Sequence, residues 1–182
     1  MIDFKLLDKN KTYVCLEYGT GTISKLIQQY TKEYCDNVTP PSHVFALVYD
    51  DRANDWLVFE SHSNPSEMGC LSSGTRRYYR VILEKVFPQV LTHSEVYQLD
   101  INVDTLYKFL CKPYGFGDIL QLMKAAIHHT NGKQKDRPGY ICSEYIALSY
   151  PLIQEYFDLP SWCITPAHFK KYVMDNQIGK IS

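Results

Sequence analysis

The sequence lacks the features that direct a chain into a membrane, out of the cell or onto a nucleic acid. No run approaches the ~18 apolar residues of a membrane span, and the N-terminus has neither the basic start nor the apolar core of a secretory signal. Lysine and arginine together number 19 against 20 for aspartate and glutamate, which gives no electrostatic reason to expect a nucleic acid or an anionic membrane. We therefore expect a cytoplasmic protein with no membrane span and no nucleic-acid partner.

Paired cysteines are also missing. The chain has six cysteines and no CxxC pair, and without a secretory route they are expected to be reduced thiols rather than a disulfide framework. No short spacing of cysteine and histidine suits a metal site, so we expect no metal and no cofactor. Internal repeats, low-complexity tracts and long linkers are absent too, and 182 residues fit one domain, 1–182, with its own hydrophobic core.

The sequence does contain a change of pattern near residue 102, from strands to helices. Strands are predicted at 11–19, 42–50, 56–63, 76–86 and 95–101. Helices are predicted at 19–34, 103–112, 117–130, after Cys142 and at 165–176. An antiparallel sheet followed by helices, with one helix before most of the strands, predicts an α+β fold.

Several helix boundaries follow from cap residues and proline. Thr20 or Thr22 is expected to cap the helix at 19–34, and Thr165 the helix at 165–176, where Pro166 takes the first position. Pro151 is expected to end or kink the helix that begins at Cys142. The helix at 19–34 also carries one apolar stripe, formed by Ile23, Leu26, Ile27, Tyr30 and Tyr34.

The two strands at 42–50 and 56–63 are predicted to form a hairpin whose pairing brings polar residues together. If 50–55 form the loop, Tyr49 opposes Trp56, and the same register places His43 opposite His62. Because opposed residues share a face and residues alternate along a strand, His43, Glu60 and His62 should point the same way. The first of the two strands is apolar on both sides, which indicates a central strand covered on both faces.

Cys142 follows a turn at Pro138 and Gly139 and begins a predicted helix. A buried cysteine is most often only a small core residue. A helix N-terminus, however, favours thiolate over thiol and offers N–H donors to an oxyanion. Both interpretations are open from position alone.

A thiolate nucleophile needs a base, and His43 is the histidine best placed to supply one. It begins a strand that is otherwise apolar, so its ring lies at the end of the sheet, where a site can form. His128, His129 and His168 are most economically surface or capping residues, and His93 precedes a strand without polar neighbours. Glu60 is equally compatible with a solvated strand end and with a carboxylate that orients the imidazole.

Six segments, in this order, resemble one family across residues 20–169. They are "GTGTISKLIQQYTK", "SHVFALV", "VFES", "PYGFGDIL", "YICSEYIA" and "ITPAHF". The chain is similar to the permuted papain-like hydrolases of the NlpC type, in particular the YiiX-like branch, in which the histidine precedes the cysteine. The pair "SHV" and "CSE" in this order and spacing is the most specific part of the resemblance.

The resemblance implies a permuted papain-like fold and a role for each matching residue. Cys142 would be the nucleophile, His43 the general base and Glu60 the group that orients the imidazole, with His62 as the alternative third residue. The motif neighbourhood suggests Tyr114, Phe116 and Trp162 as substrate-binding residues. Each of these three is equally plausible as a core residue.

The resulting hypothesis is a thiol hydrolase that cleaves an amide or ester through an acyl-cysteine intermediate, or transfers the acyl group to another acceptor. The family suggests peptidoglycan peptides or acyl-lipid conjugates as substrates. The alternative is a non-catalytic binding or structural protein that retains the fold, such as a virion or host-interaction component. The joint presence of Cys142, His43 and Glu60 favours the hydrolase.

Overall fold

The computed structural model describes residues 1–36, 38–63, 73–115 and 139–181. Within them the strands are β1 (Tyr13–Glu17), β2 (His43–Asp50), β3 (Asp55–His62), β4 (Gly74–Tyr79) and β5 (Ser94–Gln98). The α-helices are α1 (Thr22–Thr31), α2 (Arg80–Val86), α3 (Pro88–Thr92), α4 (Val103–Lys108), α6 (Cys142–Ser149), α7 (Pro151–Phe157) and α8 (Pro166–Asp175). Short 3-10 helices are η1 (Phe4–Leu6), η2 (Lys32–Cys35) and η3 (Ser161–Cys163). The helix predicted at 117–130 lies outside the described residues.

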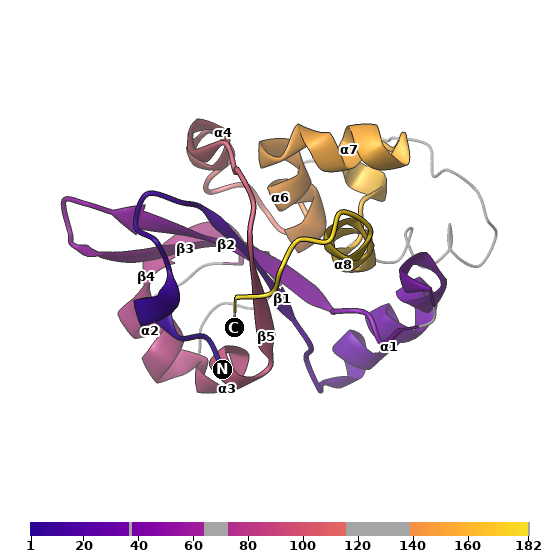
Figure 1. The fold of residues 1–182 in the computed structure, drawn as a ribbon, viewed down its shortest axis with the longest axis horizontal. Helices are drawn as coiled ribbons and strands as arrows, with labels where there is room; N and C mark the ends of the chain where they lie inside the picture. The colour runs from indigo at the N-terminus through magenta and orange to yellow at the C-terminus, as the bar shows by residue number, and fades with distance from the viewer. Residues whose placement is uncertain (37, 64–72, 116–138, 182) are drawn as a thin grey trace.

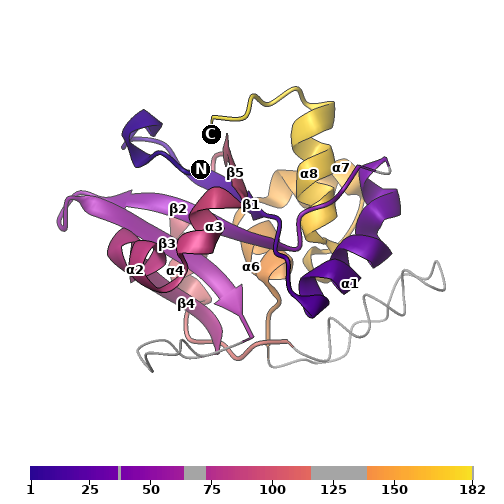
Figure 2. The ribbon, with the colours of Figure 1, turned by 90° about the horizontal axis from the view of Figure 1, so that it is seen from below.

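The strands form one antiparallel sheet in the order β4-β3-β2-β1-β5. Helices α6, α7 and α8 lie together on one side of it, and α2 and α3 lie on the other (Figure 1). The view from below shows α1 next to α8, away from α2 and α3 (Figure 2). The predicted α+β class is confirmed, and the permuted papain-like arrangement remains a prediction.

Strand β2 lies in the middle of the sheet because it is apolar on both faces. Val44 and Ala46 belong to the core beneath α6, whereas Phe45 and Leu47 belong to the core beneath α2 and α3. All four side chains are buried. The prediction of a central strand covered on both faces is confirmed.

The hairpin register predicted from the sequence is confirmed. Tyr49 pairs with Trp56, and the pairing continues in the same register to Ala46 and Phe59. Because residues alternate, this register places the side chains of His43, Glu60 and His62 on the α2–α3 face of the sheet.

The segment 76–86, predicted as one strand, is instead a strand followed by a helix. β4 ends at Tyr79 and α2 starts at Arg80. No glycine or proline marks the boundary, and the apolar run that follows suits a buried helix face as well as a strand. The prediction was therefore wrong for 80–86.

Helix boundaries were predicted well where proline sets them and less well elsewhere. α6 ends at Ser149, with Tyr150 as its cap and Pro151 opening α7, and Thr165 caps α8 through a capping box with His168. The N-cap of α1 is Gly21, and not Thr20 or Thr22. Among the described residues, no helix is long and apolar enough to cross a membrane.

Candidate active site

Cys142 is held at the start of α6 by the backbone segment before it. The Tyr140 N–H donates to Pro113 O at 3.0 Å, and Tyr140 forms a parallel bridge with Tyr114. This contact requires glycine at 139, because a Cβ there would lie 2.7 Å from Pro113 O and 2.8 Å from the Tyr114 carbonyl carbon. The sequence signal of a turn before Cys142 thus has a definite physical cause.

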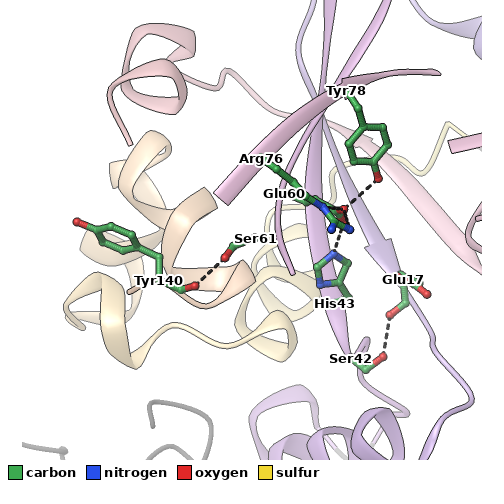
Figure 3. A network of polar contacts seen from close by, with 8 residues as sticks. All are labelled: Glu17, Ser42, His43, Glu60, Ser61, Arg76, Tyr78 and Tyr140. Atoms are coloured by element: carbon green, nitrogen blue, oxygen red, sulfur yellow. Dashed lines mark hydrogen bonds and ion pairs between the residues drawn. The ribbon is translucent and has the colours of Figure 1, made fainter. Parts of the chain in front are cut away.

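A hydrogen bond from the sheet fixes the same segment. The Ser61 hydroxyl of β3 donates to the Tyr140 carbonyl at 2.7 Å (Figure 3). Helix α6 packs against β2 and β3, and Cys142 is 6% exposed at its first position. Only Ile141 therefore separates the residue whose carbonyl is anchored to the strand from Cys142.

The first turn of α6 offers hydrogen-bond donors. The first N–H groups of a helix have no intrahelical partner, and Ile141 at the N-cap provides no side chain to satisfy them. The Ser143 hydroxyl is buried and has no hydrogen-bond partner among the described residues. Donors beside a cysteine suit an oxygen that gains negative charge.

His43 lies at the first residue of β2 and contacts a carboxylate from the neighbouring strand. Its Nε2 lies 3.0 Å from Glu60 Oε2 (Figure 3). The side chains are 13% and 6% exposed, respectively. Because His43 begins the strand, its ring is at the end of the sheet, where it also interacts with Cys142 from the opposite layer. With Nε2 facing the carboxylate, Nδ1 is the nitrogen left for the sulfur.

The other oxygen of Glu60 is held by two residues of β4 that the sequence analysis did not find. Arg76 donates to Oε1 from Nε at 2.8 Å and approaches the same atom with Nη2 at 2.6 Å. The Tyr78 hydroxyl donates to Oε1 at 3.1 Å. Glu60 and Arg76 are directly opposed in the β3–β4 pairing, so the carboxylate reaches His43 on one side and a buried cation on the other (Figure 3).

These contacts shift the ionisation of His43 and Glu60 in opposite directions. Burial acts to lower the pKa of His43, but the charge and hydrogen bond of Cys142, together with those of Glu60, hold it well above its usual value. Burial acts to raise the pKa of Glu60, but the hydrogen bond and charge of His43 and the charge of Arg76 hold it far below its usual value. An imidazolium between a carboxylate and a sulfur is the resulting arrangement.

His62 and Glu17 flank this arrangement. The His62 ring meets the His43 ring edge-on, with centroids 5.4 Å apart. Burial raises the pKa of Glu17, while the charge of His43 opposes that rise. Glu17, His62, Arg76 and Tyr78 also help to line a second cavity behind Glu60. Glu60 is thus the carboxylate that bonds to His43, and His62 is its neighbour on the same face.

A pocket of about 440 Å³, including its open mouth, lies beside Cys142. It is bordered by α1, by the start of α6 and by the start of α8. Its described lining consists of Ile27, Tyr30, Thr31, Ser42, Tyr114, Ile141, Cys142, Ser143, Thr165 and Pro166. Tyr114 is therefore placed with the candidate nucleophile, as the substrate-binding prediction requires.

The two other residues predicted to bind substrate are Trp162 and Phe116. Trp162 lies in η3, half-buried, and is not among the described residues that line the pocket. Phe116 lies outside the described residues. Of the two residues that the structure describes, Tyr114 lines the pocket with Cys142 and Trp162 does not.

The four other cysteines that the structure describes differ from Cys142 in their surroundings. Cys15 and Cys35 are buried, Cys163 is half-buried and Cys111 is exposed, all as free thiols. Burial raises the pKa of Cys15, Cys35 and Cys163. In the described part of the chain, no group of three or more histidine, cysteine, aspartate or glutamate residues could hold a metal ion.

Comparison of the chain with protein-family models gave no match, and comparison with curated proteins gave none either. The resemblance to the permuted NlpC-type hydrolases therefore stays a prediction that rests on the quoted motifs.

Proposed function

We propose that the protein is a cysteine hydrolase that cleaves an amide or ester bond through a covalent acyl-cysteine intermediate. The observation that carries the proposal is the bond between His43 Nε2 and Glu60 Oε2, at 3.0 Å, beside a Cys142 sulfur that interacts with the same imidazole. A nucleophile, a base and a group that orients the base are the elements of a hydrolytic triad, whatever their order in the chain.

Each step of the proposed reaction has a residue of the site that carries it out. The Cys142 sulfur attacks the substrate carbonyl carbon, and the carbonyl electrons move to the oxygen, which is stabilised by N–H groups at the start of α6 and by the Ser143 hydroxyl. His43 then gives its proton to the departing amine or alcohol as the carbon–nitrogen or carbon–oxygen bond breaks. Water attacks the thioester, gives a proton back to His43, and releases the acid and the Cys142 thiolate.

Arg76 and Tyr78 support the proposal because they fix Glu60 rather than the substrate. A carboxylate that accepts hydrogen bonds on both oxygens keeps its position and its negative charge. It therefore orients the His43 ring and stabilises the imidazolium. A buried cation opposite this carboxylate also offsets the cost of burying its charge. A histidine that acts as the base beside a thiolate requires a carboxylate that is held in this way.

The test is the reactivity of the thiols at about pH 6, well below the ~8.5 of a free cysteine. Among the five cysteines that the structure describes, exposure alone ranks Cys111 first and places Cys142 with the slow thiols. We expect iodoacetamide to label Cys142 fastest of the six, because only a thiolate reacts at this pH. Labelled peptides are identified by mass spectrometry at short reaction times.

His43→Ala is the paired variant, and it should remove the preference for Cys142 while unfolding in urea remains cooperative. Fastest labelling at Cys111, or at any other cysteine of the native protein, would contradict the proposal and favour a non-catalytic binding or structural protein. Loss of cooperative unfolding in His43→Ala would instead assign His43 a structural role.

A further inference from the structure

A second carboxyl group, that of Glu17, lies beside His43 in the sheet. Glu17 is the last residue of β1 and is directly opposed to His43, the first residue of β2 (Figure 3). Opposed residues of an antiparallel pair share a face, with their Cβ atoms about 5 Å apart. On its other side Glu17 is opposed to Ser94 of β5, whose hydroxyl makes no hydrogen bond within the described residues. His43 is therefore the ionisable group that strand pairing brings directly opposite Glu17.

Glu17 and Glu60 both line the second cavity, which has a volume of about 340 Å³ with its open mouth included. The cavity lies between the sheet and helices α2 and α3, since Leu83 of α2 and Val90 of α3 form part of its wall. Glu17 can therefore exchange a proton with solvent from this side of the sheet, away from the pocket beside Cys142.

The two carboxyl groups differ in the charges that oppose them. Arg76 Nη2 lies 2.6 Å from Glu60 Oε1, so this buried pair carries no net charge. An imidazolium beside a neutral pair gains less stabilisation than one beside an unpaired carboxylate. Glu17 is opposed by His43 and Ser94 rather than by a permanent cation. It can therefore supply a negative charge that Arg76 does not already balance.

Ionisation of Glu17 costs folding stability. Burial raises the pKa of Glu17, and the charge of His43 opposes that rise, while Glu60 adds to it and His93 reduces it. The ionisable groups that face Glu17 are His43 of β2, Glu60 and His62 of β3, Arg76 and Tyr78 of β4, and His93 after α3. A carboxylate that costs stability, placed beside an imidazolium that it favours, indicates a functional rather than a structural role.

We infer that Glu17 is a second positioning residue of the site, whose negative charge holds His43 as the imidazolium beside Cys142 and whose protonation in acid weakens that pair. The inference rests on the proposed function and adds to it a carboxyl group that regulates the nucleophile with pH. Cys142 belongs to the core on the opposite side of the sheet, whereas Glu17 shares the face of His43. The charge of Glu17 therefore favours the imidazolium more than it disfavours the thiolate.

The test compares Glu17→Gln with the wild type in the rate of iodoacetamide labelling at Cys142, from about pH 4 to about pH 7. Each rate is divided by that of exposed Cys111 in the same sample. In acid, Glu17 of the wild type is protonated and neutral, so the two proteins should label at the same rate. As the pH rises through the pKa of Glu17, which lies above its ordinary 4.5, only the wild type gains a charge. The wild type should then become about three- to tenfold faster, the effect of one charge at about 6 Å beside a partly solvated cavity.

Two further variants separate charge from structure. Glu17→Asp keeps the carboxylate and should keep the rise with pH. Glu84→Gln removes the same charge from an exposed position of α2, on the same side of the sheet, and its ratio to the wild type should stay near one at every pH. A loss of rate in Glu17→Gln that is the same at every pH would assign Glu17 a structural role.

A second measurement does not need Glu17→Gln to fold. Coupling between two charges is reciprocal, so loss of the imidazolium in His43→Ala should raise the pKa of Glu17. This pKa is measured in both proteins by carbon-13 NMR of the Glu17 carboxyl carbon. An unchanged pKa would overturn the inference.

The outcomes separate this inference from the proposed function. Preferential labelling of Cys142 in the wild type, with a ratio to Glu17→Gln that does not change with pH, would overturn the role of Glu17 and leave the nucleophile in place. No preferential labelling of Cys142 in the wild type would overturn both. The expected result is a ratio that rises with pH, together with a higher pKa of Glu17 in His43→Ala.

Discussion

Replacing Glu60 by glutamine tests the site most directly, because the change removes a charge and almost no volume. Arg76 and Tyr78 both donate to Oε1 of Glu60, so the amide oxygen of glutamine must take that position. Its NH₂ group then faces His43 Nε2 and donates to it. Nε2 must be unprotonated to accept, which places the ring proton of neutral His43 on Nδ1, facing Cys142.

The expected fall in the labelling rate of Cys142 follows from this change of tautomer. With Nδ1 protonated, His43 cannot accept the Cys142 proton. The pKa of His43 also falls, because the charge of Glu60, which raises it together with that of Cys142, is gone. Without the ion pair, a thiol with an ordinary pKa of ~8.5 is about 0.3% ionised at pH 6. Labelling of Cys142 at about pH 6 should therefore slow on the order of 100-fold, since lost thiolate outweighs the gain in intrinsic nucleophilicity.

Stability should fall at the same time, because the buried Arg76 cation loses its counter-ion. We expect a loss of about 3 kcal/mol in the free energy of unfolding at neutral pH, measured by urea titration. Two further measurements complete the test: the rate of iodoacetamide labelling at Cys142, and an NMR titration of the His43 ring.

His62→Gln is the matched control, because His62 lies on the same face and contacts the same ring. It should change the labelling rate and the His43 titration far less than Glu60→Gln does. If His62→Gln gives the larger shift and Glu60→Gln leaves both observables unchanged, the reasoning is refuted and His62 is the orienting residue.

Two more predictions follow from the same contacts. Gly139→Ala should destabilise the protein by several kcal/mol and slow the labelling of Cys142, because the added Cβ would lie within 3 Å of the backbone at Pro113 and Tyr114; an unchanged melting temperature would contradict this. The lowered pKa of Glu60 contributes stability that is present above its ordinary value of about 4.3 and is lost as the pH falls toward the folded-state value. The difference in unfolding free energy between wild type and Glu60→Gln should therefore shrink between about pH 5 and pH 2 in urea titrations, and a difference that grows would show the opposite linkage.

The half of the site that lies on one hairpin could be predicted from the sequence. A loop of known length fixes which residues are opposed, and alternation fixes which share a face. The sequence alone therefore predicts that His43 and Glu60 lie together on one face. The start of α6 at Cys142 was equally accessible, because the turn before it and Pro151 after its last turn bound the helix.

The contribution of β4 could not be predicted in the same way. Arg76 lies opposite Glu60 only because β3 and β4 pair in one particular register. The connection between these strands is too long for its length to set that register. The pattern from Arg76 onward also predicts one strand, because the change to helix at Arg80 depends on tertiary packing rather than on a local breaker residue.

The fate of the α1 stripe shows a second limit. Periodicity correctly indicated one apolar face at Ile23, Leu26, Ile27 and Tyr30, but periodicity does not state what covers a face. Two of these four residues remain exposed. An apolar stripe normally indicates a buried helix face, but part of this stripe borders the pocket beside Cys142 instead.

Two consecutive residues of strand β3 point to opposite faces of the sheet, and each holds a different part of the site. Glu60 points to one face and holds His43, while Ser61 points to the other and holds the Tyr140 carbonyl, two residues before Cys142. Thermal motion that shifts β3 therefore carries the base and the nucleophile in the same direction. The distance between them changes less than the position of either one within the molecule, so the site can keep its geometry while the sheet around it fluctuates.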